Sequence, residues 1–420
     1  MFDYSEFEFD QIEATESTFS DGLYIPDASE CMRCGQCVSV CPTFRIFETD
    51  EETPRRRIRT ISKLIVEKQP ISADEQVHLD NCLQCRACET VCPSRMAYGA
   101  LFDKAQAELQ PGRTGSWQVE LGFWLIAHKH IRNMLLPLIS VYLKSGLQQL
   151  VSRSGLLNRL NLANAASLLK QPSLSYLSSI HPVKKRKIRG RVALFTGCLA
   201  EQFDQSTQLA AIKLLNAFGY EVVVPENQSC CGAIHSHHGR SAQSLIDNNI
   251  ATFYALEVDA IIYTATGCGA TLADYRSDDE EKSGWFRRYV FDINDFLLAH
   301  WPAGLQLAAS NLNVAVHEPC SQRNTLKNSQ AVYALLQKIP GINIVPLPEN
   351  SLCCGAGGSY MLTHPEIAQQ LKQRKLQTID KSAADLIVSS NFGCAYFLNA
   401  QQPKATLSVM HPIQLLADRI

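Results

Sequence analysis

The sequence of 420 residues lacks the long apolar runs from which membrane spans are built. Its best candidate, residues 135–143, is too short to cross a bilayer, because a helical span needs about 20 apolar residues. The sequence begins with the acidic segment MFDYSEFEFD, which has neither the basic region nor the apolar region of an export signal. We therefore expect a cytoplasmic chain without membrane spans.

A basic surplus is also missing. The 39 Lys and Arg residues are balanced by 41 Asp and Glu residues, so the net charge is −2, and nucleic acid is not an expected partner. No G-x-G-x-x-G follows a strand pattern, and the sequence contains no P-loop and no G-x-S-x-G elbow. These absences leave no evident site for a nicotinamide, a flavin or a substrate, and we assign no catalytic residue.

Cysteine, by contrast, is abundant, with 16 residues. A disulfide framework requires an oxidising compartment, whereas clustered thiols in a reducing compartment usually bind metal. The cysteines fall into three groups. One lies between residues 31 and 92, and two groups of four follow after about a hundred residues without cysteine. This distribution favours metal binding.

The first group has the spacing of a two-cluster ferredoxin. Cys31-x2-Cys34-x2-Cys37-x3-Cys41-Pro42 is repeated as Cys82-x2-Cys85-x2-Cys88-x3-Cys92-Pro93. In such repeats the first three cysteines bind one [4Fe–4S] cluster and the fourth crosses to the other. The pattern predicts cluster 1 on Cys31, Cys34, Cys37 and Cys92, and cluster 2 on Cys82, Cys85, Cys88 and Cys41. A zinc site, the alternative, favours simple C-x-x-C pairs.

The C-terminal part is an internal duplication. Cys198 corresponds to Cys320, the pair Cys230–Cys231 to Cys353–Cys354, and Cys268 to Cys394, at offsets of 122, 123 and 126 residues. Each copy is therefore the size of a domain. In the first copy, strand patterns at residues 192–195, 220–224 and 260–264 alternate with helix patterns at 207–218 and 241–257.

This alternation predicts a parallel sheet covered by helices. Each cysteine follows the carboxyl end of a strand, and in a parallel sheet these ends share one edge. The four cysteines of each copy should therefore converge on a further iron–sulfur cluster or metal. The sites are Cys198, Cys230, Cys231 and Cys268 in the first copy, and Cys320, Cys353, Cys354 and Cys394 in the second. Buried structural thiols, a vicinal disulfide and zinc remain alternatives.

Several residues near these cysteines invite an interpretation. Gly232 and Gly355 follow the vicinal pairs, where a positive φ helps a loop to wrap a metal. The run 355–358 resembles a phosphate cradle, but its place after two cysteines favours a flexible loop. His317, three residues before Cys320, is a candidate additional ligand. His235, His237 and His238 could also add ligands, although we favour the interpretation that they form a solvated loop.

The middle of the chain has helical periodicity over residues 117–170, and a basic linker, residues 184–187, follows it. The expected organisation is α+β and α/β multidomain. An acidic tail (1–22), solubilising or partner-docking, precedes a mainly helical two-cluster ferredoxin-like domain (23–110). A helical connector (111–190) leads to two Rossmann-like cysteine-rich domains (191–305 and 306–420).

On these motifs the sequence resembles the iron–sulfur subunit of glycolate oxidase, a glycolate dehydrogenase. The segments 266–270, 360–365 and 391–394 and the terminal His411-Pro-Ile are also similar to that subunit. The repeats resemble cysteine-rich domains of heterodisulfide reductase and of anaerobic glycerol-3-phosphate dehydrogenase. Both copies, however, keep only one cysteine of the final C-x-x-C of that pattern. Residues 54–58, PRRRI, also depart from the PRGRI of the glycolate subunit.

The resemblance implies an electron-transfer subunit of a flavin-dependent 2-hydroxy-acid dehydrogenase, with glycolate as the expected substrate. Its partners would be FAD-containing subunits and a quinone or membrane acceptor, with FAD only on the partners. The subunit would be cytoplasmic or peripheral on the cytoplasmic face of the inner membrane. Three alternatives remain. The chain could be a heterodisulfide-reductase-like enzyme, the iron–sulfur subunit of a lactate or glycerol-3-phosphate dehydrogenase, or a non-enzymatic sensor that responds to cluster loss.

Overall fold

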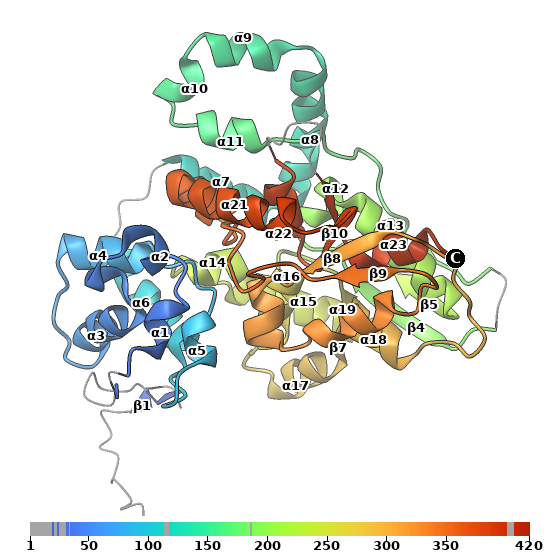
Figure 1. The fold of residues 1–420 in the computed structure, drawn as a ribbon, viewed down its shortest axis with the longest axis horizontal. Helices are drawn as coiled ribbons and strands as arrows, with labels where there is room; N and C mark the ends of the chain where they lie inside the picture. Colours follow the sequence, from blue (N-terminus) through green and yellow to red (C-terminus); the bar gives the residue numbers. More distant parts are fainter. Residues whose placement is uncertain are drawn as a thin grey trace, which may run out of the picture.

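The computed structural model describes residues 31–32, 34–112, 117–184, 187–400 and 407–420. It also describes two short antiparallel strands, β1 (Phe19–Ser20) and β2 (Leu23–Tyr24). The rest of the predicted acidic tail and the middle of the predicted basic linker lie outside the described residues. In Figure 1 a helical N-terminal domain lies beside a larger α/β part, and a helical arm projects above.

The N-terminal domain is built from short helices around a small apolar core. Its longest helices are α3 (Pro54–Ile65) and α6 (Tyr98–Leu109), which bury Ile58, Ile61 and Leu101 against each other. Thr53 caps α3 and Pro54 occupies its first turn, where a missing N–H costs nothing. The other elements are α1 (Gln36–Ser39), α2 (Phe44–Phe47), η3 (Asp50–Glu52), α4 (Ala73–Asp80), α5 (Ala87–Thr90) and η4 (Gln110–Gly112).

The predicted helical connector consists of five helices: α7 (Trp117–Ala127), α8 (Lys129–Lys144), α9 (Leu147–Arg153), α10 (Leu156–Arg159) and α11 (Ala163–Leu168). Glycine residues with positive φ, Gly146 and Gly155, separate α8, α9 and α10. None of the described helices could cross a membrane alone, although α8 and α9, bent by 78°, reach the length and apolar composition of a span together.

The first cysteine-rich domain contains a five-stranded sheet of order β3-β5-β4-β6-β7. Its four parallel strands are β4 (Gly190–Phe195), β5 (Tyr220–Val223), β6 (Ala260–Tyr263) and β7 (Val290–Asp292), and β3 (Ile180–His181) is antiparallel. The helices are α12 (Ala200–Phe203), α13 (Gln205–Ala217), α14 (Ala233–His237), α15 (Gln243–Tyr254), α16 (Thr266–Leu272), α17 (Glu280–Tyr289) and α18 (Ile293–Ala299). The predicted strands and helices of this copy are all present within a few residues.

The second domain repeats this topology in a four-stranded parallel sheet of order β11-β10-β8-β9. The strands are β8 (Asn313–His317), β9 (Asn343–Val345), β10 (Leu386–Ser389) and β11 (Val409–Met410). The helical elements are η5 (Ser321–Leu326), α19 (Ser329–Leu336), α20 (Tyr360–Thr363), α21 (Pro365–Asp380), α22 (Phe392–Leu398) and α23 (Pro412–Ala417). The order β5-β4-β6-β7 thus corresponds to β9-β8-β10-β11, as expected for two copies of one domain.

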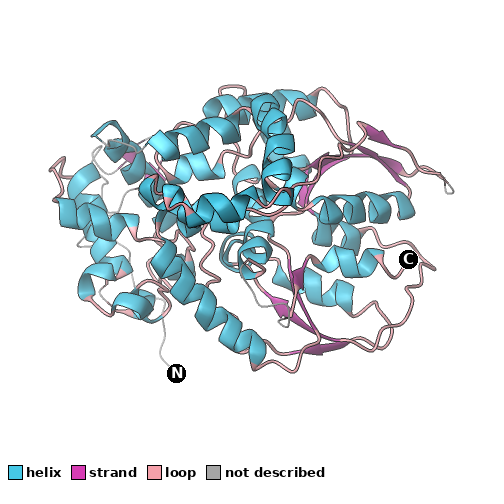
Figure 2. Cartoon of the chain, turned by 90° about the horizontal axis from the view of Figure 1, so that it is seen from above, coloured by secondary structure: helices cyan, strands magenta, loops and turns pink. Residues whose placement is uncertain are grey.

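The two domains share one hydrophobic core. Val192 and Leu194 of β4 and Val314 and Val316 of β8 belong to the same buried cluster. The C-terminal α23 packs against α13 of the first domain. Figure 2 shows both sheets (magenta) on the side of the molecule opposite the N-terminal domain. The copies are therefore one packed unit, in which α13 contacts α23 and α18 contacts α19 between the two domains.

Candidate functional site

The cysteines of the N-terminal domain form two groups. A small cavity of about 30 Å³ is lined by the first three cysteines of the first motif together with Cys88 and Cys92. A second, of about 20 Å³, is lined by the first three cysteines of the second motif and by Cys41. Cys92 therefore joins the first motif and Cys41 the second, as the expected crossover requires. The assignment of ligands to clusters remains a prediction.

A buried arginine lies beside the second group. Arg57 of α3 is 2% exposed and forms an ion pair with the equally buried Glu52. Its Nη1 donates to Thr43 Oγ1 at 3.0 Å and lies 3.7 Å from Cys41 Sγ. A guanidinium in this place offsets the negative charge of thiolates and of an iron–sulfur cluster. The sequence analysis noted the run 54–58 only as a departure from the glycolate subunit, because its burial depends on packing against α4.

In each cysteine-rich domain, the four cysteines converge as predicted. Cys198 and Cys320 follow β4 and β8, and Cys268 and Cys394 lie in the first turn of α16 and α22, just after β6 and β10. The vicinal pairs lie on the loops after β5 and β9. In the second domain the sulfurs of Cys354 and Cys394 are 3.0 Å apart.

The glycine after each vicinal pair adopts the same conformation in both copies. Gly232 has a φ of +86° and Gly355 a φ of +85°. Each backbone N–H donates to the sulfur two residues earlier, Cys230 or Cys353, at 3.4 Å. Packing also excludes any side chain at position 355, since a Cβ at Gly355 would lie 2.4 Å from Ala368 O. The expected positive φ is present, and it places an amide donor on the sulfur.

The two sets of thiols line a single cavity of about 550 Å³, which the sequence analysis did not predict. The same cavity reaches Cys82 and Cys85 of the N-terminal domain. Asn324 Nδ2 donates to Cys85 O at 2.7 Å, and Tyr360 Oη donates to Asn81 O at 3.0 Å, so the second domain is held directly against the second cysteine motif. The cavity lining includes Cys198, Cys230, Cys231, Cys268, Cys320, Cys353, Cys354 and Cys394.

The protonation of these thiols fits a site for a cation. The pKa of Cys353 is held well below its usual value because Cys320 and Cys354 both hydrogen-bond to its sulfur. The contacts of Cys320 and Cys354 with Cys353, together with burial, hold the pKa values of Cys320 and Cys354 well above the usual value of a thiol. Burial and the neighbouring thiols therefore oppose the ionisation of Cys320 and Cys354, and nearby positive charge would offset this effect. A metal or an iron–sulfur cluster supplies that charge, and sulfur is the donor that both prefer.

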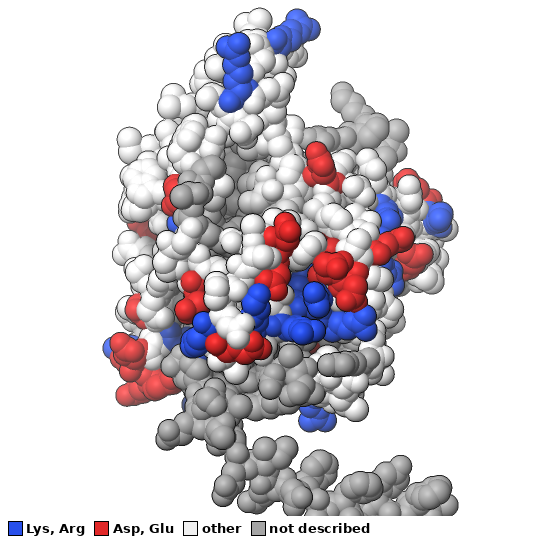
Figure 3. Space-filling view, turned by 90° about the vertical axis from the view of Figure 1, so that its left-hand side faces the viewer, with Lys and Arg blue, Asp and Glu red and all other residues white. Residues whose placement is uncertain are grey.

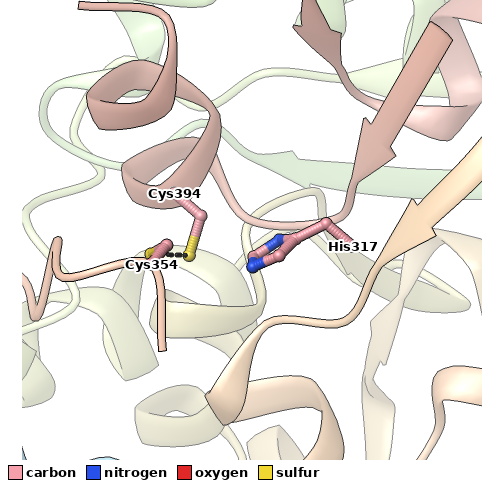
Figure 4. A group of neighbouring side chains, drawn as sticks. All are labelled: His317, Cys354 and Cys394. Carbon is pink, nitrogen blue, oxygen red and sulfur yellow. Dashed lines mark hydrogen bonds between the residues drawn. The ribbon is translucent and has the colours of Figure 1, made fainter. Parts of the chain in front are cut away.

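His317 lies beside the cysteines of the second domain. A ring nitrogen of His317 and the sulfurs of Cys354 and Cys394 lie within 4.8 Å of one another, and Figure 4 shows the imidazole pointing toward the two sulfurs. Its Nδ1 is 2.9 Å from Ser389 Oγ, and burial lowers the pKa of the imidazole well below its usual value. Asn391 Nδ2 donates to Cys394 Sγ at 3.3 Å. His317 was a candidate from its sequence position, whereas Asn391 appeared only within the segment 391–394 that resembles the glycolate subunit.

Other interpretations of this region need revision. His235, His237 and His238 do not form a solvated loop, because α14 carries the first two and all three pack against neighbouring elements. Phe123 packs edge-on against the rings of His235 and His238, and His237 Nδ1 is 3.3 Å from Asp103 Oδ1.

The glycine run after Cys354 is likewise closely packed. A Cβ at Gly357 would lie 2.6 Å from Tyr360 Cβ and 2.9 Å from Leu83 Cδ2. Gly357 therefore allows a close approach to the N-terminal domain, whereas the expectation for the run 355–358 was a flexible loop.

Comparison with known proteins agrees with this architecture. A model of the cysteine-rich domain family matches residues 192–273 and 314–399, and a model of the 4Fe-4S dicluster domain matches residues 27–96. A protein from Bacillus subtilis named "Probable glycolate oxidase iron-sulfur subunit" is 33% identical over 410 residues, which cover 91% of each chain. The chain belongs to the family of glycolate oxidase iron–sulfur subunits.

Of two less similar relatives, one has the same name and the other a different one. The "Glycolate oxidase iron-sulfur subunit" of Escherichia coli is 29% identical over 407 residues, or 93% of each chain. "Lactate utilization protein A" of Shouchella clausii is 26% identical over 238 residues, which are 54% of this chain and 99% of that one. The chain is thus an iron–sulfur protein of the glycolate oxidase and lactate utilization type with a redox role.

Proposed function

We propose that the chain is the electron-transfer subunit of a flavin-dependent 2-hydroxy-acid dehydrogenase, with glycolate as the expected substrate. It carries electrons from FAD-containing partner subunits toward a quinone-type acceptor at the cytoplasmic face of a membrane. An iron–sulfur cluster, when bound, takes up and passes on one electron at a time. The residues of this chain hold the clusters, set their surroundings and keep them close to one another.

The observation that carries this proposal is the continuity of the cysteine groups. Cys88 lines both small cavities of the N-terminal domain, so the two predicted clusters adjoin. Cys82 and Cys85 line the second of these cavities and also the large cavity of the cysteine-rich domains. Cys34 is exposed, whereas Cys353 and Cys354 are buried. The groups thus form a path from the surface to the interior, with cluster 1 at its outer end.

The decisive experiment separates the chain from its partners. The purified chain should accept electrons from dithionite but show no glycolate-dependent reduction of a dye, and addition of the FAD subunits should restore turnover. Cys34→Ser should then abolish quinone-linked activity while glycolate still bleaches the flavin. Met32→Ser, an exposed neighbour in the same loop, is the matched control and should leave both activities intact.

The large cavity favours a second candidate, a self-contained redox enzyme of the heterodisulfide reductase type. A volume of about 550 Å³ lies within the range of small-molecule sites, and thiols of both domains line it. Glycolate-dependent dye reduction by the chain alone, with flavin rigorously absent, would overturn the electron-transfer proposal in favour of this one.

A further inference from the structure

The duplication places different residues at one equivalent position of the two cysteine-rich domains. His317 ends β8 three residues before Cys320, and Phe195 ends β4 three residues before Cys198. In the sheet, His317 is paired with Ser389 of β10, and Phe195 with Tyr263 of β6. The second domain therefore offers an imidazole and a hydroxyl where the first offers two aromatic rings.

The environment of His317 is that of a metal ligand. The residue is 1% exposed, and its Nδ1 is within hydrogen-bond distance of Ser389 Oγ. Metal-binding histidines usually donate one ring N–H to a neighbouring acceptor, which fixes the tautomer and leaves the other nitrogen free to bind. With Nδ1 engaged by Ser389, Nε2 is the nitrogen available for a metal near Cys354 and Cys394 (Figure 4).

We propose that the iron–sulfur centre of the second cysteine-rich domain takes a nitrogen ligand from His317, whereas the centre of the first domain is held by sulfur alone. This inference rests on the proposed function, because it requires iron–sulfur centres in the cysteine-rich domains. It makes the two centres chemically different despite their common origin. Nitrogen in place of sulfur raises the reduction potential of such centres, so the two should titrate separately.

Pulsed electron paramagnetic resonance on the complete protein, with ¹⁵N-labelled histidine, tests the proposal across a full redox titration. We expect one histidine nitrogen coupling in the wild type. His317→Cys, which replaces nitrogen by sulfur, should retain the iron and lose the coupling. His235→Gln is the matched control, since His235 is a buried histidine of α14, four residues after Cys231, and it should keep the coupling.

Two results would overturn the inference: a wild type without histidine coupling in any redox state, or a coupling that persists in His317→Cys. Iron analysis distinguishes this failure from that of the proposed function. Two N-terminal cubanes account for about eight irons. An iron content of about eight or less would remove the centres themselves, whereas a higher content without the coupling would refute His317 alone.

A second inference concerns the arm, which we define as residues 134–160 of the helical connector. The connector is anchored on both sides of the arm. Arg132 and Lys129, just before the arm, pair with Glu201, and Tyr396 Oη donates to Leu168 O at 2.7 Å after it. The arm between these anchors projects from the body of the protein (Figure 1).

The arm exposes apolar side chains at helical spacing. Met134, Leu138 and Val141 recur every three or four residues along α8 and are 64–75% exposed. A face of this kind is costly in water and usually marks an interaction surface. It continues through Leu147 and Leu150 of α9 to Leu156 of α10. At about 24 Å for its 16 residues, α8 is shorter than the bilayer core of about 30 Å, so it suits the interface rather than a span.

The charge of the arm has one sign. The sequence contains no Asp or Glu between Glu120 and Glu201, and the arm carries exposed Lys144, Arg153 and Arg159. Figure 3 shows the top of the projection as white and blue without red. We infer that the arm docks on an anionic lipid surface, with its apolar side chains in the headgroup region and its basic side chains on the lipid phosphates. An acid-free surface of this kind complements lipid phosphate.

Sedimentation with vesicles of phosphatidylcholine and phosphatidylglycerol tests this inference on the complete protein. We expect binding that weakens at least tenfold on pure phosphatidylcholine and at least tenfold in the variant Met134→Glu/Leu138→Glu. The control Leu209→Glu/Leu362→Glu makes the same change in charge at exposed apolar positions of α13 and α20 and should bind normally. No binding to the anionic vesicles, or equal binding by both variants, would overturn the inference. Loss of a flavoprotein partner with lipid binding intact would assign the arm to a protein instead.

Discussion

At the scale of single residues, the buried carboxyl of Asp292 shows how a helix cap couples stability to pH. Asp292 ends β7 and caps α18, and its Oδ1 accepts bonds of 2.8 Å from Asn294 N and Asn294 Nδ2. Its Oδ2 is buried without a hydrogen-bond partner among the described residues. Burial, followed by the negative charge of Asp295, raises the pKa of Asp292 to about 7. In the unfolded chain an aspartate titrates near 3.9.

The sign of the effect follows from these two values. The folded state binds the proton more tightly, so the contribution of Asp292 to stability is complete below about pH 4 and is lost as the pH rises through about 7. Asp292→Asn keeps a capping side chain and removes the ionisation. It should raise the free energy of unfolding at pH 8.5 by on the order of 1–4 kcal/mol, and by much less at pH 4.5, where the unfolded chain also begins to bind the proton.

Anaerobic thermal unfolding of both proteins at the two pH values measures this difference. Asp247→Asn, an exposed carboxyl of α15, serves as the control and should change neither curve. An equal shift of Asp292→Asn at pH 4.5 and pH 8.5 would contradict the assignment.

At the scale of elements, α14 is fitted closely against α6 of the N-terminal domain. Gly239, just after α14, has a φ of +69°, and a Cβ there would lie 2.1 Å from Gln106 O. Gly146 has a similar φ of +76° but open space around it. Alanine at either position costs about 1–2 kcal/mol for the left-handed backbone. Gly239→Ala should cost about 1–3 kcal/mol more, because the methyl group overpacks the contact.

Unfolding midpoints in denaturant for the two alanine variants separate backbone strain from packing. Limited proteolysis should show earlier release of the N-terminal domain in Gly239→Ala only. Equal midpoints would mean that the two parts are not held by this contact.

Many elements could be predicted from the sequence, because their signals are local. Val192, Ala193 and Leu194 are apolar on both faces, as a buried parallel strand requires, and Gly219 ends α13 with a φ of +92°. The antiparallel β3 was missed, because Ile180–His181 is a two-residue strand specified by pairing with β5. This strand lies before residue 191, so the first sheet includes residues that the prediction assigned to the connector.

At the scale of the whole molecule, convergence within each cysteine-rich domain was predictable, whereas the meeting of the two domains was not. The first follows from strand order in a single sheet. The second depends on the packing of α23 against α13 and on the side chains of β4 and β8 that share a core. The same holds for contacts with the N-terminal domain. The hydrogen bond from Asn324 to Cys85 O joins residues 239 positions apart, and such a contact leaves no local pattern in the sequence.

The shared cavity also constrains how the protein matures. Cys82 and Cys85 come from the N-terminal domain, and Cys354 and Cys394 come from the end of the chain, yet all four line one space in the packed molecule. Six of the eight thiols of the cysteine-rich domains are buried there. Iron and sulfide for the proposed centres would therefore have to reach thiols that become buried as these parts pack together. On that assignment, insertion of the inorganic groups is coupled to folding of the chain.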